Sequence, residues 1–209
     1  MTGVQTCALP IWLIVRSTVR GRQLLDTLSI LPLAVPGLVL AFGYIAISFQ
    51  LMTTFRHTKW LSDLLDVQQN PVIFLIIAYA MRRLPYVVRS AVAGFEQTPE
   101  DLELAARNLG AGPLVTLRRI TLPLISANLL AGALLAFAFA LLEVSDSLIL
   151  AQKQTYWPIT KTIYELFQRL GDGPHIASAL GVWAMLLLTL TLLSASTMLG
   201  KRMGTLFRV

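Results

Sequence analysis

Three long runs without a Lys, Arg, Asp or Glu constrain the fold of this chain most. They extend from Thr27 to Phe55, from Ile120 to Leu142 and from Gly173 to Gly200. Each is longer than the roughly 20 residues that an α-helix needs to cross the hydrocarbon core of a bilayer. Hydrophobic residues make up 56% of the chain and charged residues 13%, and the mean hydropathy is +0.69. These values lie outside the range of soluble domains and predict an all-α integral membrane protein.

A fourth span is predicted between Val67 and Val88, with Arg82 and Arg83 facing protein or reaching toward a polar surface. Residues 12–15 resemble the last turn of one more apolar helix. The sequence therefore predicts about four complete transmembrane helices and the end of a truncated one.

A short helix is strongly specified between two of these apolar runs. Thr98 is a suitable N-cap and Pro99 suits the first helical position, so the start is well defined. Arg107 lies in the predicted last turn, and Gly110 is a natural left-handed terminator just after it.

This helix carries a narrow apolar stripe, formed by Leu102, Ala105, Ala106 and Leu109 at positions i, i+3, i+4 and i+7. An ordinary amphipathic helix in a loop would show the same stripe. Its place between membrane spans favours a docking surface for a cytoplasmic partner, because small residues allow close approach of another surface.

The segment resembles the EAA loop of ABC-importer permeases. The likeness rests on Ala105-Ala106, on Gly110 four residues later, and on Ile120-x-Leu122-Pro123 after a spacing of nine residues. Leu104 departs from the pattern, because the family has its glutamate there and this chain has Glu103 one position earlier. Any salt bridge carried by that glutamate is therefore in question here.

The resemblance implies a MetI-like permease bundle with a coupling loop at residues 96–123, whose helix from Pro99 to Leu109 is seated in a separate ATPase subunit. It also implies a second permease domain, which is identical, homologous or fused, and an external or periplasmic substrate-binding protein. The residues implied in ATPase coupling are Leu102, Glu103, Ala105, Ala106, Leu109, Gly110, Ile120, Leu122 and Pro123.

The chain carries no Gly-x-x-x-x-Gly-Lys-Ser/Thr loop, so ATP is expected to be bound by a partner and the chain itself is not expected to be an enzyme. No cofactor is expected. His57 and His175 stand alone in the sequence, which predicts neither a metal site nor a catalytic triad. The net charge of +6 is attributed to membrane topology, without a nucleic-acid partner.

Lys and Arg residues predict the orientation of the spans. If the spans alternate, one side of the membrane receives Arg16, Arg20, Arg22, Arg89, Arg107, Arg118, Arg119, Lys201, Arg202 and Arg208. The other side receives fewer basic residues, and acidic residues offset them. The coupling loop and the C-terminus are therefore predicted on the cytoplasmic side of a bacterial inner membrane.

Pro32, Pro36, Glu143 and Asp146 are candidate pore or gate residues. The prolines fit either a tolerated kink or a flexible element beside the translocation path. Glu143 and Asp146 are three residues apart and share a helix face, where they form a polar helix end or a pair met by cationic cargo or by a basic residue such as Arg82 or Arg83.

The segment 155–173 is aromatic and amphipathic and is expected at the outer face. It fits either an interfacial helix on the lipid boundary or a contact with an external binding protein.

The likeness is closest to the ferric-iron type of importer permease, with polyamine, phosphonate, thiamine and sulfate relatives behind it. This makes ferric iron the expected cargo. The alternatives of another class are an ion-driven secondary transporter and a membrane scaffold, but neither explains the loop at 96–123.

Residues 1–11 resemble a translated sequencing adapter. On this interpretation Cys7, the single cysteine of the sequence, is artefactual. Residues 12–209 are then an N-terminally truncated transmembrane domain.

Overall fold

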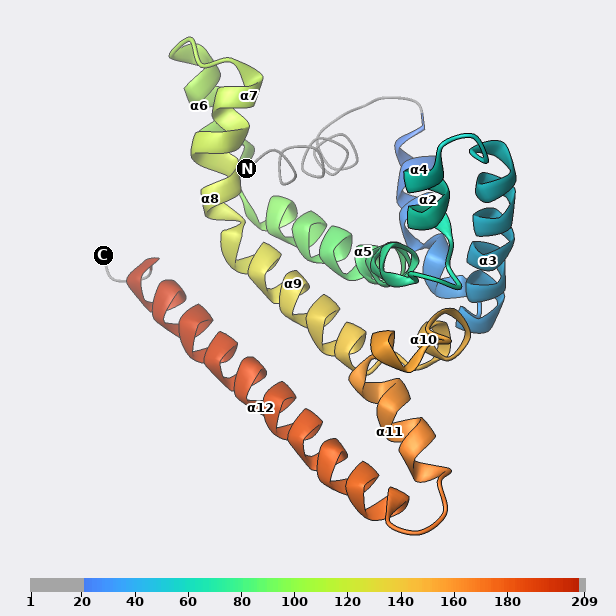
Figure 1. The fold of residues 1–209 in the computed structure, drawn as a ribbon. Helices are drawn as coiled ribbons and strands as arrows, with labels where there is room; N and C mark the ends of the chain where they lie inside the picture. Colours follow the sequence, from blue (N-terminus) through green and yellow to red (C-terminus); the bar gives the residue numbers. More distant parts are fainter. Residues whose placement is uncertain (1–20, 207–209) are drawn as a thin grey trace. The chain divides into compact units, whose positions relative to one another are not determined.

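The computed structural model describes residues 21–206, and every regular element in this range is a helix (Figure 1). The predicted all-α fold is thereby confirmed. In chain order the elements are α2 (Arg22–Ala34), α3 (Gly37–Thr54), α4 (Lys59–Leu65), α5 (Val72–Gln97), α6 (Glu100–Asn108), α7 (Pro113–Thr116), the π-helical turn η1 (Leu117–Thr121), α8 (Leu122–Leu124), α9 (Ser126–Leu141), α10 (Ser145–Leu150), the 3₁₀ turn η2 (Gln154–Tyr156), α11 (Ile159–Phe167) and α12 (Gly173–Leu206). The predictions for residues 1–11 and 12–15 lie outside the described residues.

The first apolar run is divided into two helices, α2 and α3. Pro36 is the N-cap of α3, with φ −57° and ψ 138°, so the backbone leaves the helical region there. Proline also disfavours the helical conformation of the residue before it. Pro32, by contrast, lies inside α2. The run from Thr27 to Phe55 therefore does not form one continuous helix. The span predicted within it is α3, which is long and apolar enough to cross a bilayer.

Helix α5 is longer than the predicted fourth span and is shifted along the sequence. It runs for 26 residues, continues through Arg82 and Arg83, and includes Pro85. Helix α5 is long enough to cross a bilayer, but with its charged residues it is not apolar enough to count as a span by composition.

The last two apolar runs differ in continuity. The stretch from Pro113 to Leu124 meets α9 at an angle of 69°, so the predicted span from Ile120 to Leu142 is bent. Helix α12 is one continuous helix, and its Gly173–Ser194 part is long and apolar enough to cross a bilayer (Figure 1). Within the described residues, two helices meet the requirements of a span, or three if the bent pair counts as one.

The helices divide into two compact units. Of the described residues, one unit contains 21–31, 84–136 and 194–206, and the other contains Pro32–Arg83 and Phe137–Leu193. The core of the first unit includes Val88, Ala91, Phe95, Leu117 and Ile125. The core of the second includes Ala41, Val67, Phe74, Leu75, Ala78, Leu150 and Ala151. Each unit therefore has an apolar core of its own.

Small residues bring α5 and α9 close together in the first unit. A methyl group on Gly94 would lie 3.0 Å from the Cβ atoms of both Ile125 and Asn128, and one on Gly132 would lie 2.7 Å from Ser90 Cβ. Close approach through small residues is typical of helix packing in membranes. This packing holds the bend at Ile125 against α5, directly after the loop at 96–123.

Candidate functional site

Helix α6 forms as its local sequence predicts. It begins after Pro99, which is the N-cap, and the hydroxyl of Thr98 donates to the carbonyl of Gly94. The predicted N-cap at Thr98 is therefore displaced by one residue. Arg107 lies in the last turn, and Gly110 has the left-handed φ of 85° that a helix terminator requires.

The exposed face of α6 differs from the predicted docking stripe. Ala106 is buried at 7% exposure, so it does not share a surface with Leu102 and Leu109, which are 44% and 89% exposed. Leu104 and Ala105 are exposed as well. With a helical period of 3.6, the row pointing away from the chain consists of Asp101, Leu104, Ala105 and Asn108.

Glu103 lies on the buried side of the helix. Its side chain is 5% exposed, and its Oε1 accepts a hydrogen bond of 3.1 Å from the hydroxyl of Thr121, which is 1% exposed. The hydroxyl donor partly compensates the cost of burying the carboxylate. The pair joins α6 to η1 and closes the loop between them across 18 positions of the sequence.

The other predicted coupling residues lie in and after η1. The N–H of Leu122 donates to the carbonyl of Leu117, a π-type bond between residues five apart. Pro123 has no N–H and would crowd the carbonyl four residues earlier, which accounts for the wider turn at this point. Leu122 packs against the core of the first unit. Ile120 is half-buried, and Pro123 is exposed.

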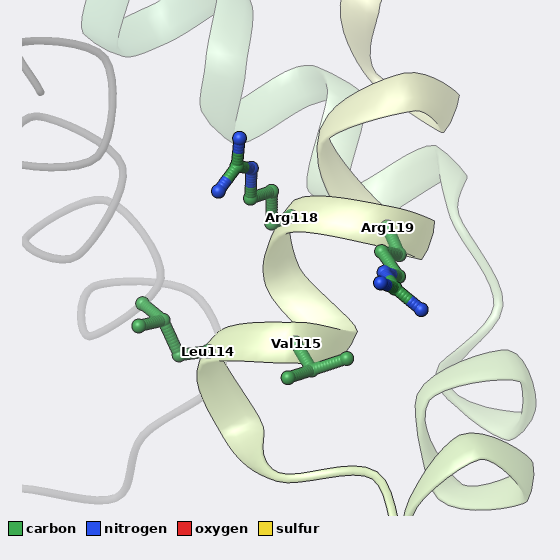
Figure 2. Close-up of a pocket in the computed structure, with 4 residues that line it drawn as sticks. All are labelled: Leu114, Val115, Arg118 and Arg119. Carbon is green, nitrogen blue, oxygen red and sulfur yellow. The ribbon is translucent and has the colours of Figure 1, made fainter. Parts of the chain in front are cut away.

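A hollow on the surface of the same loop combines apolar and basic side chains. It is lined by Leu114 and Val115 from α7 and by Arg118 and Arg119 from η1. Figure 2 shows the four residues on successive turns, with the two guanidinium groups extending from the ribbon in different directions. Leu114 and Val115 are each about half exposed.

A buried charge cluster lies in the second unit, where Arg82 and Arg83 of α5 meet Glu143 and Asp146. Arg82 Nη1 is 3.5 Å from Asp146 Oδ1, and Arg82 Nε is 3.6 Å from Glu143 Oε2. Arg83 Nη2 donates to Glu143 Oε2 and to the carbonyl of Phe139. Two cations and two anions balance one another, which is required when charges leave water.

The cluster bears on the alternatives stated for Glu143 and Asp146. Glu143 and Asp146 are 7% and 1% exposed, and the basic residues named from the sequence are their partners. Of the two alternatives stated for Arg82 and Arg83, facing protein or reaching toward a polar surface, these contacts agree with the first. A pair of free carboxylates waiting for cationic cargo does not agree with this arrangement.

Gly37 is part of the cluster, although its sequence context did not indicate it. A methyl group at Gly37 would clash with Arg82 Nη1 and would lie 2.8 Å from Arg82 Cζ and 2.9 Å from Ser145 Cβ. The N-terminus of α3, just after Pro36, is therefore in direct contact with the arginine. Of the two candidate prolines, Pro36 adjoins this cluster through its neighbour.

Helix α11 holds the segment that carries the two acids. The hydroxyl of Thr160 donates to the carbonyl of Glu143 at 2.6 Å. Lys161 Nζ donates to the carbonyls of Leu148 and Ala151 at 3.0 and 2.6 Å. Lys161 is 3% exposed, and this burial lowers its pKa below the ordinary value of 10.5, while Glu165 acts in the opposite direction.

Within residues 21–206, no group of three or more His, Cys, Asp or Glu side chains is arranged to hold a metal ion.

Comparison with known proteins gives a consistent result. The family described as "Binding-protein-dependent transport system inner membrane component" matches residues 8–205. The sulfate transport system permease protein CysT of Salmonella typhimurium is 29% identical over 205 residues, covering 92% of this chain and 68% of the relative. The probable sulfate transport system permease protein cysT of Marchantia polymorpha is 29% identical over 186 residues, covering 87% and 62%.

Another relative is named for different anions. The molybdate/tungstate transport system permease protein WtpB of Methanocaldococcus jannaschii is 33% identical over 132 residues, covering 62% of this chain and 50% of the relative. The chain thus spans between 50% and 68% of the length of these three proteins. None of the three is named for ferric iron.

A solved structure shares the fold. A chain of a bacterial alginate ABC transporter, crystallised with an alginate pentasaccharide-bound periplasmic protein, matches with a TM-score of 0.68. The match covers 93% of this chain and 70% of that chain at 19% identity, so the likeness concerns the fold alone. It confirms the bundle predicted from the loop pattern.

Proposed function

Because this chain belongs to the family of binding-protein-dependent transport system inner membrane components, we propose that it is a permease subunit of an ATP-driven importer. The observation that supports this most directly is the loop at 96–123. Helix α6 exposes Leu104 and Ala105 outward and is tied inward through Glu103 to the turn that leads into α9. A partner that binds the exposed face of α6 and moves it would therefore also move the segment that leads into α9.

The partner that moves α6 is a separate ATPase subunit. This chain has no phosphate-binding loop of the Gly-x-x-x-x-Gly-Lys-Ser/Thr type, so the ATP is bound by the partner. A second permease domain and an external substrate-binding protein complete the assembly. The excess of Lys and Arg around the loop supports a cytoplasmic location of α6.

The mechanism we propose is alternating access. Closure of the ATPase pair moves α6 and, through the bond between Glu103 and Thr121, the π-helical turn η1. The turn is joined to α9 by a bend of 69° at Ile125, which packs in the core of its unit. A rigid core transmits displacement because it is close-packed.

For the cargo we propose a tetrahedral oxyanion of the sulfate or molybdate class, in place of the ferric iron expected from the sequence. The names of the relatives support this class. The charge cluster is also compatible with it, since Glu143 and Asp146 are paired with arginines and offer no free negative charge to a metal cation.

A single substitution tests the coupling role. We expect Gly110→Asp to abolish ATP-dependent uptake of radiolabelled sulfate or molybdate while the protein stays in the membrane, because a side chain at φ 85° strains the turn that orients α6. Gly112→Asp is the matched control, since Gly112 has φ −68° and open space around it. Normal uptake by the Gly110→Asp protein would refute the assignment, and uptake without ATP would favour an ion-driven transporter.

A further inference from the structure

The acidic residue of the coupling helix faces inward in this chain. The EAA pattern places a glutamate directly before the two alanines, at the position of Leu104. Here the acid is Glu103, whose side chain is 5% exposed and bonded to Thr121, while Leu104 is 51% exposed. The shift by one residue turns the carboxylate by about 100° around the helix, from the outer row to the inner one.

The outer row of α6 is therefore apolar at its centre. Leu104 and Ala105 occupy the middle, and Leu109 flanks them at 89% exposure. Asp101 and Asn108 lie one turn before and after. Asp101 is the charged residue of this row and lies in the first turn, where it and the neighbouring Glu100 favour the positive N-terminal end of the helix dipole.

We propose that the partner ATPase meets this helix through an apolar contact centred on Leu104 and Ala105, and that the wall of its groove opposite Leu104 is apolar. This inference rests on the proposed function. A lysine or arginine directly opposite Leu104 would be buried against an apolar side chain, with the nearest exposed carboxylates of α6 one turn away at Glu100 and Asp101, which is less favourable than an apolar partner. Glu103 cannot supply the counter-charge while it is bonded inside the loop.

The proposal assigns two different roles to two neighbouring residues. Leu104 provides affinity for the partner by removing apolar surface from water. Glu103 provides the internal link to η1 and does not touch the partner. Substitutions at the two neighbouring positions should therefore have different consequences for binding.

The experiment measures the affinity of the detergent-solubilised transporter for its cognate ATPase subunit, purified separately and added back. We expect Leu104→Glu to weaken binding at least tenfold and Leu104→Gln to weaken it less, with Leu104→Met close to the original protein as the matched control. The melting temperature should stay unchanged in all three, because the position is exposed on a helix.

Equal or tighter binding by the Leu104→Glu protein would overturn the proposal, because it would indicate a basic groove. Unchanged binding in all three variants would overturn it as well, since Leu104 would then lie outside the contact. We further expect Glu103→Gln to leave the affinity within about twofold; a larger loss with an unchanged melting temperature would show that the carboxylate meets the partner.

Binding of the ATPase by the unsubstituted protein tests the proposed function separately from the apolar contact. If it binds no ATPase at all, the proposed function fails and the docking contact fails with it. If it binds the ATPase and the variants behave otherwise than stated, only the apolar contact is wrong.

Discussion

Arg82 Nη1 lies 3.5 Å from Asp146 Oδ1, and this contact joins α5 to α10 across 64 positions of the sequence. The two residues depend on one another unequally. Asp146 is 1% exposed, whereas Arg82 is 16% exposed and also lies 3.6 Å from Glu143. Loss of the arginine therefore leaves a deeply buried carboxylate, while loss of the aspartate leaves an arginine that still has a partner.

The first prediction follows from this asymmetry. Arg82→Gln should lower the free energy of unfolding by about 3–5 kcal/mol, the cost of leaving a buried charge unpaired, and Asp146→Asn should lower it by about 1–3 kcal/mol. The double variant should be more stable than Arg82→Gln alone, because the orphaned charge is gone. Thermal melts in detergent measure all three proteins. Additive losses in the double variant would contradict the direct contact.

A second prediction concerns the glycine beneath the arginine. Gly37→Ala should lower the free energy of unfolding by about 1–3 kcal/mol, since its methyl group would overlap the guanidinium of Arg82. Gly43→Ala on the same helix is the control, because a methyl group there meets nothing within 4 Å. Alanine at that position should be neutral or slightly stabilising. Equal effects of the two substitutions on the melting temperature would argue against close packing at Gly37.

A third prediction tests the bond that closes the loop at 96–123. Thr121→Val keeps the shape of the side chain but removes the donor to Glu103, and should cost about 1–3 kcal/mol. Thr121→Ser retains the hydroxyl and should lose less. Amide hydrogen exchange of α6 gives a local measurement, and we expect faster exchange in the valine protein only. Faster exchange in both would assign the effect to packing, and unchanged exchange in both would show that the hydrogen bond does not stabilise α6.

The sequence predicts local features of this fold well. Helix α6 ends where Gly110 requires it, and the break at Pro36 lies where a proline removes a donor, because both depend on residues next to one another. The side of α6 that is buried could not be predicted in this way. It depends on Thr121, which lies 18 positions from Glu103, and an apolar stripe alone does not show which neighbour it meets.

The charge cluster illustrates the same limit. Glu143 and Asp146 share a face by spacing, and their cost in a membrane called for basic partners, so Arg82 and Arg83 could be proposed. Gly37 could not, because a glycine in an apolar run carries no sign of what approaches it. The hydrogen bonds from Lys161 of α11 to the carbonyls of Leu148 and Ala151 could not be predicted for a similar reason. Every residue has a backbone carbonyl, so such a partner leaves no pattern in the sequence.

The last prediction concerns Lys161, which donates hydrogen bonds to the carbonyls of Leu148 and Ala151. These two carbonyls lie in and directly after α10, the helix that carries Asp146. Lys161→Met keeps a side chain of similar length but replaces the ammonium group by an apolar end, so both carbonyls lose this donor. We expect a loss of about 1–3 kcal/mol in the free energy of unfolding near neutral pH. Lys161→Arg, which keeps donors and charge, should lose less unless its larger head cannot be accommodated.

The pH dependence has a definite sign. Burial lowers the pKa of Lys161 in the folded protein below 10.5, so the unfolded chain binds more protons in the interval between the two values. Folding stability contributed by this group should therefore rise with pH through that interval, as the charged amine of the folded state is neutralised. Thermal melts of the original and Lys161→Met proteins from pH 7 to 10.5 measure the difference. The original protein should gain stability relative to the methionine variant toward the upper end, and a relative loss there would mean that the carbonyls hold the ammonium form strongly enough to outweigh burial.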